Sequence, residues 1–168
     1  KNNSYKKQFK EDDSLGGIDP YSSSKAACEL SIDSFRKSFC GNKKYQKNDL
    51  HIASARAGNI IGGGDWSQNR IIPDIINSIV SKNKIVIRQP KSIRPWQHVL
   101  DPLAGYLKLA EKLFLEGNSF ASAFNFGPTS ASNKTVFELI KSAEKYFPFT
   151  WEIIEKDNNF YEAPFIGL

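Results

Sequence analysis

The stretch Asp19-Pro20-Tyr21-Ser22-Ser23-Ser24-Lys25 joins a helix start to a pair of side chains that can carry chemistry. Asp19 can accept hydrogen bonds from the free amides of a first helical turn, and Pro20 fits the first helical position. Tyr21 and Lys25 are one helical turn apart, about 6 Å along the axis, so they leave the same face. The stretch therefore predicts a helix that presents a phenol and an ammonium group together.

A phenol beside an ammonium group can serve as a general base. A free phenol has a pKa of about 10, and a nearby positive charge favours its ionised form. The three serines between Tyr21 and Lys25 leave room for something flat to approach the helix. Tyrosine and lysine also meet at this spacing by chance in many helices, so the pair alone does not establish a catalytic site.

Short apolar runs and amphipathic helices alternate along the rest of the chain. Apolar runs predict strands at 50–57, 85–88, 124–126 and, as an edge strand, 149–155. Start signals and periodic apolar residues predict helices that begin at Pro20, near Ile72, at Asp101-Pro102 and after Thr135. This alternation is typical of parallel βα units. We expect an α/β fold with a partial Rossmann-type parallel sheet and a smaller C-terminal substrate-binding subdomain.

The bulk composition is that of a soluble globular protein. The 168 residues are 40% apolar and 24% charged, with a net charge of +5 and no methionine. The glycine fingerprint of a dinucleotide fold is also missing, so we expect a fragment without its N-terminal half. The basic clusters lack interleaved aromatics or a known nucleic-acid motif, and no apolar run is long enough for a membrane. We therefore expect a cytoplasmic protein that binds neither nucleic acid nor membrane.

The cysteines and histidines show no metal-binding pattern. Cys28 and Cys40 are twelve residues apart, and neither has a zinc-site spacing with His51 or His98. We expect buried free thiols and no metal.

Three motifs in order resemble the extended short-chain dehydrogenase/reductases of the NAD-dependent epimerase/dehydratase family. They are residues 15–25, residues 55–66 and residues 93–99. Among the members of that family, they look most like the CDP-glucose 4,6-dehydratases. The resemblance implies NAD as cofactor and a sugar nucleotide, CDP-glucose, as substrate. It also implies a homodimer formed through a helix bundle that includes the tyrosine helix.

The resemblance assigns a role to individual residues of this sequence. Tyr21 would take the proton from the sugar O4, while Lys25 would hold the nicotinamide ribose and lower the Tyr21 pKa. Both would thus contact the cofactor, together with the backbone around Gly58 and Ile60. The implied substrate-binding residues are Asn59, Arg70, Arg94, Asn125 and Glu162.

These assignments have simpler alternatives. Asn59 and Asn125 can be turn residues, and Arg70 and Arg94 can be surface charges. Glu162 belongs to Tyr161-Glu162-Ala163, where the family usually has His-Glu-Ala, so its role is in doubt.

The implied reaction is oxidation of the sugar at C4, elimination of water and return of the hydride, giving CDP-4-keto-6-deoxyglucose. Residues 1–58 would be the second half of the NAD-binding Rossmann domain. Residues 59–168 would be mainly the substrate-binding region, with returning Rossmann elements and a truncated C-terminus. Three alternatives stay open: another sugar-nucleotide enzyme such as a 4-epimerase, a non-catalytic fragment that only binds sugar nucleotide, and an anion-binding or nucleic-acid-binding protein. We expect the chain alone to have little or no activity.

Overall fold

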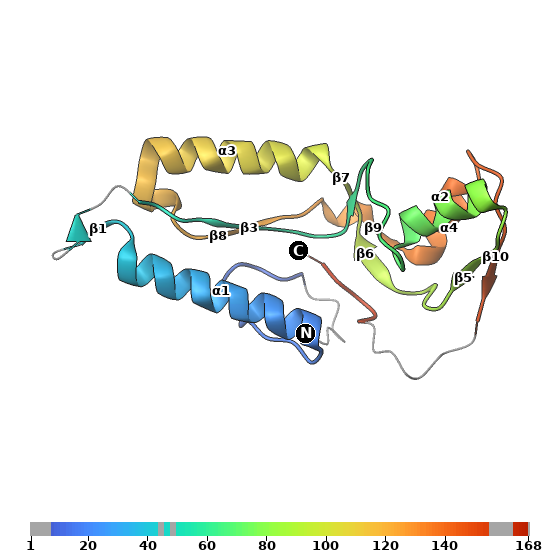
Figure 1. The fold of residues 1–168 in the computed structure, drawn as a ribbon, viewed down its shortest axis with the longest axis horizontal. Coiled ribbons are helices and arrows are strands. Elements are labelled where there is room, and N and C mark those ends of the chain that lie inside the picture. Colours follow the sequence, from blue (N-terminus) through green and yellow to red (C-terminus); the bar gives the residue numbers. More distant parts are fainter. Residues whose placement is uncertain (1–7, 44–45, 48–49, 155–162, 168) are drawn as a thin grey trace.

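The structure is a computed structural model that describes residues 8–43, 46–47, 50–154 and 163–167. The molecule is elongated (Figure 1). Helices α1 (Pro20–Phe39) and α3 (Leu100–Glu116) lie near one end, and α2 (Ile71–Ser81) and α4 (Val136–Ala143) near the other. The 3₁₀ turns are η1 (Gly117–Phe120) and η2 (Ser130–Ser132).

The strands are short and pair in twos. They are β1 (Asn42–Lys43), β2 (Gln46–Lys47), β3 (Ser54–Ala57), β4 (Ile60–Ile61), β5 (Ile85–Ile87), β6 (Ile93–Pro95), β7 (Gln97–His98), β8 (Ala123–Phe126), β9 (Asn133–Thr135) and β10 (Trp151–Ile153). The pairs β3–β8, β4–β7 and β5–β10 are parallel, whereas β1–β2 and β6–β9 are antiparallel. The fold is α/β, as predicted, with two antiparallel pairs that the sequence pattern does not reveal.

The β3–β8 pair is the centre of the first half of the molecule. In Figure 1, α1 runs along one side of this pair and α3 along the other. A Cβ at Gly105 of α3 would come within 2.3 Å of the Phe126 ring, so the missing side chain lets α3 approach β8 closely. This half thus has the helix–sheet–helix layering of a βα protein.

The core of the second half is built from isoleucines of α2, β5 and α4. Ile75, Ile85, Ile87 and Ile140 are buried, and Ile140 is fully inaccessible. Seven partly buried apolar residues pack against this cluster: Ile71, Ile72, Ile79, Val136, Ala143, Phe149 and Trp151. The predicted strand at 149–155 contributes through β10, which pairs with β5 as an edge strand. This core fixes the start of α2 and the end of β5.

Local start signals predict two of the helices correctly. The Asp19 carboxylate accepts a 2.9 Å hydrogen bond from the Ser22 amide and so caps α1. Thr135 and Glu138 form a reciprocal capping box at α4. The prediction for α3 needs correction, because this helix begins at Leu100 and Asp101 lies within its first turn without capping it.

Two further observations concern the chemical character of the chain. Cys40 is buried as expected, but Cys28 is exposed, because it lies on α1, a helix in which no residue is buried by the part of the chain that the structure describes. Within the described ranges, no helix combines the length and apolar character needed to cross a membrane.

Candidate functional site

A cleft of about 650 Å³ lies between the two halves of the molecule, within the usual size range of ligand pockets. Its walls come from the loop after β3, the start of α2 and the ends of β5 and β6. The lining residues that carry polar side chains are Tyr21, Asn59, Asp65, Asn69, Arg70, Asp74, Arg88, Gln89, Arg94 and Trp96. Parallel strands characteristically bind ligands at their carboxyl ends, which is where this cleft opens.

The phenol of Tyr21 stands at the edge of the cleft. The side chain lies in the first turn of α1, is 72% exposed and lines the cleft. The Lys25 Nζ lies 5.8 Å from the centre of the Tyr21 ring, so the two groups share one helix face as predicted. Lys25 does not itself line the cleft. The arrangement therefore places a cation behind the phenol.

Contacts with β3 and with the residues just before it hold the tyrosine helix in position. Glu29 of α1 accepts a 2.9 Å hydrogen bond from the Ser54 hydroxyl and lies 3.8 Å from Nη1 of Arg56. Farther along the helix, Arg36 Nε donates to the Ile52 carbonyl oxygen at 2.7 Å. Because the same strand leads into the cleft loop, these contacts set Tyr21 relative to that loop.

The glycine-rich loop after β3 forms the next part of the wall. Gly58, Asn59 and Ile60 all line the cleft, beside Tyr21. A Cβ at Gly62 would lie 2.7 Å from the Val99 side chain, so the backbone of this loop approaches Val99 closely. Gly64 has a φ of +82°, a conformation that favours glycine.

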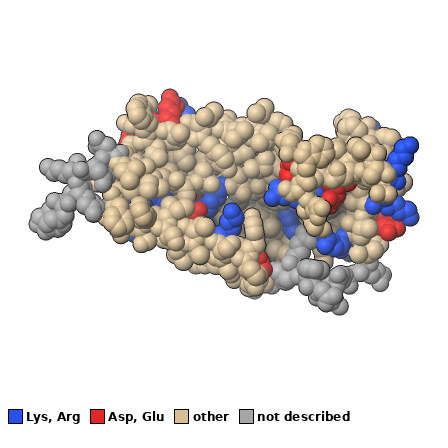
Figure 2. All heavy atoms as spheres, in the orientation of Figure 1, with Lys and Arg blue, Asp and Glu red and all other residues tan. Residues whose placement is uncertain are grey.

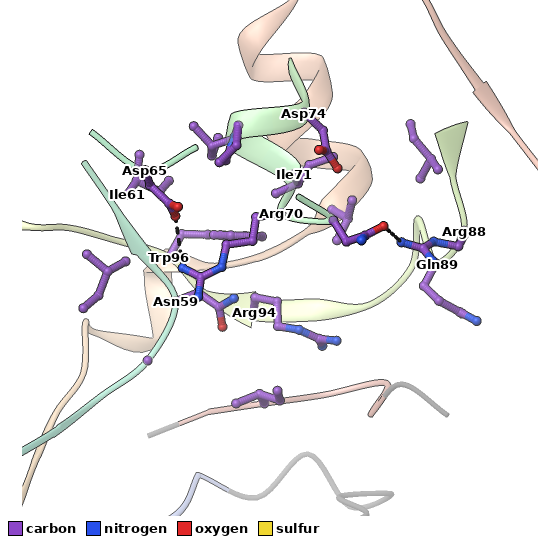
Figure 3. A pocket seen from close by; sticks show the side chains of 18 of the residues that line it. Asn59, Ile61, Asp65, Arg70, Ile71, Asp74, Arg88, Gln89, Arg94 and Trp96 are labelled. Atoms are coloured by element: carbon purple, nitrogen blue, oxygen red, sulfur yellow. Dashed lines mark hydrogen bonds and ion pairs between the residues drawn. The ribbon is translucent and has the colours of Figure 1, made fainter. Parts of the chain in front are cut away.

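Two arginines occupy the middle of the cleft (Figure 3). Arg94 is only 5% exposed, and its Nη1 donates to the Ile93 carbonyl oxygen at 2.8 Å. Arg70 is exposed and forms a 3.0 Å ion pair with Asp65. The pKa of Asp65 is lowered, first by the Ser67 amide and hydroxyl and then by Arg70. On the face drawn in Figure 2, lysine and arginine atoms are visible within the hollow between the halves.

The start of α2 adds a second positive feature to the same region. Arg70 is the N-cap residue, and no side chain caps the helix there. The amides of a first helical turn carry a partial positive charge and bind anions. Since Ile71 and Ile72 line the cleft, this helix end faces the space between the arginines. The middle of the cleft is therefore suited to a phosphate or diphosphate.

The far end of the cleft holds polar residues that the sequence analysis did not single out. Arg88 follows β5 and donates a 3.0 Å hydrogen bond from Nη2 to Oδ1 of Asn69. The Asn69 amide donates to the Asp74 carboxylate in the first turn of α2. Burial raises the pKa of Asp74, because desolvation outweighs the Asn69 hydrogen bond and the Arg88 charge. Arg88 could have been identified from the sequence, because it is an arginine at the carboxyl end of a predicted strand, where parallel strands bind ligands.

A match to the NAD dependent epimerase/dehydratase family covers residues 3–121 of the sequence. This chain belongs to that family. A curated relative, the CDP-glucose 4,6-dehydratase of Salmonella typhimurium (strain LT2), is 42% identical over 161 residues. That alignment covers 95% of this chain and 45% of the relative.

Solved structures show the same fold at low sequence identity. The dTDP-glucose 4,6-dehydratase of Bacillus anthracis, in complex with NAD, has a TM-score of 0.72 at 18% identity, covering 98% of this chain and 48% of that one. The UDP-glucuronic acid 4-epimerase of Bacillus cereus, in complex with UDP-glucuronic acid and NAD, has a TM-score of 0.75 at 16% identity. It covers 96% of this chain and 47% of the epimerase. The chain thus spans about half the length of the family members it matches.

Asn125, one of the residues predicted for the substrate site, lies away from the cleft. Asn125 lies on β8, where its side-chain amide donates to the Phe9 carbonyl oxygen at 3.3 Å. Its backbone amide donates to Glu11 at 2.7 Å, so the segment before α1 occupies the polar groups of Asn125. Asn125 is not among the residues that line the cleft, and its contact with substrate stays a prediction. Glu162 lies outside the described residues.

Proposed function

We propose that this chain forms the catalytic-helix and substrate-binding part of an NAD-dependent sugar-nucleotide 4,6-dehydratase that converts CDP-glucose to CDP-4-keto-6-deoxyglucose. The observation that carries the proposal is one cleft that contains both the Tyr21 phenol and the arginines Arg70 and Arg94. The 42% identity to the Salmonella dehydratase supports the choice of reaction and substrate.

The order of groups along the cleft suits a sugar nucleotide. A diphosphate between Arg70, Arg94 and the start of α2 would meet two guanidinium groups and a helix N-terminus. Its sugar would then extend toward Asn59 and Tyr21. Arg94 is already fixed by its bond to Ile93, so it can orient a phosphate with little loss of side-chain entropy.

The residues around Tyr21 also fit the nicotinamide end of NAD. The phenol is exposed on the cleft side, small serines surround it on α1, and Gly58 and Ile60 border the same space. A flat ring can therefore approach Tyr21 without meeting a large side chain from α1. Lys25 has the donor chemistry to hold a ribose hydroxyl. Residues 1–58 would contribute to the dinucleotide-binding domain, and residues 59–168 mainly to the substrate region.

When bound, NAD would supply the redox chemistry by accepting a hydride from C4 of the sugar and returning it to C6 after water is lost. Tyr21 would act as the general base and take the O4 proton as C4 is oxidised. Lys25 stabilises the ionised phenol through its positive charge, since a cation near a phenolate favours it. The resulting 4-keto group makes the C5 hydrogen acidic, which permits elimination across C5 and C6.

The proposed assembly is a homodimer formed through α1. Leu30, Phe35 and Phe39 of this helix are 62%, 55% and 50% exposed, and no residue of α1 is buried. Exposed apolar side chains grouped on one helix are a common feature of protein–protein interfaces.

The test is an assay of the protein that carries this chain, supplied with CDP-glucose and NAD. A 4-keto-6-deoxy product is followed by its absorbance in alkali. We expect Tyr21→Phe to reduce kcat by about 10²- to 10⁴-fold, the range for loss of a general acid or base. Tyr146→Phe is the matched control, because Tyr146 is 78% exposed and does not line the cleft. Full activity in Tyr21→Phe would contradict the proposed role.

The same assay separates the alternatives. A 4-epimerase would convert the sugar nucleotide to its C4 epimer without forming a 4-keto-6-deoxy product. A protein that only binds sugar nucleotide would retain CDP-glucose unchanged in the presence of NAD.

A further inference from the structure

The polar groups at the far end of the cleft come from three separate segments. Asn69 lies in the loop before α2, Asp74 in the first turn of α2, and Arg88 directly after β5. In Figure 3, Arg88 lies beyond Arg94, on the side of the cleft away from Asn59 and Ile61, and Asp74 lies above Arg70 at the start of α2. A second hollow of about 520 Å³ shares these three residues, so the cleft stays open beyond them.

Hydrogen bonds hold these three side chains in place, but the described contacts leave part of their hydrogen-bonding capacity for a ligand. Asn69 adopts a φ of +62°, an uncommon conformation for any residue but glycine, and this lets its backbone bond Asp74 while its side chain meets Arg88. Within the described part of the chain, the Arg88 guanidinium donates one of the five hydrogen bonds that it can make. Burial opposes ionisation of Asp74, so the carboxylate is held in place at some cost in stability. Such a group favours a ligand that supplies a donor to the carboxylate.

We propose that Asp74 and Arg88, positioned by Asn69, form the subsite for the nucleotide base and select cytosine over uracil or thymine. The assignment rests on the proposed function, since it takes the ligand to be a sugar nucleotide with its diphosphate at Arg70 and Arg94. With the sugar toward Tyr21, the nucleoside reaches the opposite end of the cleft, where these residues lie.

The hydrogen-bonding edge of the base accounts for the selectivity. Cytosine presents an amino donor at N4 and acceptors at N3 and O2, whereas uracil and thymine present an acceptor at O4 and a donor at N3. A carboxylate accepts from the cytosine amino group, and a guanidinium donates to N3 and O2. Uracil would place its O4 against the carboxylate and its N3–H against the guanidinium. Two of the three edge positions would then be mismatched.

The experiment uses CDP and UDP as probes, because they carry the base and diphosphate but need no catalysis. Calorimetric titration of the protein that carries this chain gives the two dissociation constants. We expect CDP to bind about tenfold or more tightly than UDP, since one good base contact discriminates by about that factor. Asp74→Asn and Arg88→Gln should each reduce the preference several-fold, whereas Asp101→Asn should leave it unchanged. Asp101 is the matched control, because it is also an aspartate in a first helical turn but lies outside the cleft.

Equal binding of CDP and UDP by the unaltered protein would overturn the base assignment, even if the dehydratase assay succeeds. A preference for CDP that neither substitution changes would overturn it as well. If CDP is preferred through Asp74 and Arg88 but no 4-keto-6-deoxy product forms, the base subsite stands and the proposed reaction fails. Asp74→Asn keeps the shape of the side chain, so folding of this variant is expected, and a circular dichroism melt checks it.

Discussion

The charged side chains along the cleft are held by two different kinds of contact. Arg94 is buried and bonds a backbone carbonyl of its own strand, so its position is set before any ligand arrives. Arg70 is exposed and pairs with Asp65, and exposed ion pairs contribute little to stability because water screens them. A phosphate can therefore replace Asp65 as the partner of Arg70 at small cost. One arginine is preset, while the other can adjust.

Asp74 gives a prediction about stability and pH. Its folded pKa is raised above the ordinary value of 3.8, so the protonated form suits the folded state better. The resulting stabilisation is present at low pH and is lost as the pH rises through the folded pKa. At pH 7, Asp74→Asn should therefore raise Tm by a small amount, about 1–3 °C.

Thermal melts at a series of pH values check this prediction. The difference in Tm between Asp74→Asn and the unaltered protein should shrink as the pH is lowered through the folded pKa of Asp74. Asp101→Asn serves as the control and should show no such gain. A lower Tm for Asp74→Asn at pH 7 would mean that ionised Asp74 stabilises the fold.

At the scale of a helix, the Asp19 cap makes the start of α1 sensitive to acid. The pKa of Asp19 is lowered, mainly by the Ser22 hydroxyl and then by the Ser22 amide. The cap's contribution is complete above the unfolded value of about 3.8 and is lost as the pH falls through the lower folded pKa. The Ser22 amide resonance in an NMR titration should therefore shift with a midpoint below 3.8.

Asn is also a good N-cap residue but carries no titrating carboxyl. In Asp19→Asn the Ser22 shift should consequently be independent of pH in this range, with α1 still formed. A Ser22 midpoint at or above 3.8 in the unaltered protein would contradict the lowered pKa.

Elements with local signals could be predicted from sequence, whereas those set by distant partners could not. The capping residues Asp19 and Thr135 mark α1 and α4 correctly. The start of α3 depends instead on a contact with a distant residue. Val99 donates to the Ile61 carbonyl oxygen at 2.8 Å, and the chain then passes from β7 directly into the helix at Leu100, before Asp101. The β6–β9 pair likewise joins residues some forty positions apart in the sequence, such as Arg94 and Lys134.

The same distinction applies to the cleft. Tyr21, Asn59 and Arg94 lie in the three long motifs, Arg70 follows the second motif closely, and the structure brings all four to the cleft. Asn125 also lies beside a recognisable turn, but its polar groups are taken by a segment more than a hundred residues earlier. A contact between residues so far apart in the sequence cannot be recognised from the local sequence pattern.

At the scale of the whole molecule, apolar side chains are exposed on both outer helices. Besides the apolar residues of α1, Leu107 and Phe114 of α3 are 75% and 89% exposed. The two helices lie on opposite sides of the β3–β8 pair (Figure 1), so a partner that covers one leaves the other uncovered. The proposed dimer uses α1, which makes the choice of helix testable.

The test compares one charged substitution on each helix. Phe35 packs against Phe39, with ring centres 4.7 Å apart, so Phe35→Glu places a charge within the apolar group of α1. Burying that charge in an interface is costly, so the dimer should dissociate at least about tenfold more readily. Sedimentation velocity of the protein that carries this chain measures the change. Phe114→Glu is the matched control and should leave the dimer intact; if it dissociates the dimer while Phe35→Glu does not, the interface lies on α3 and the assignment to the tyrosine helix is overturned.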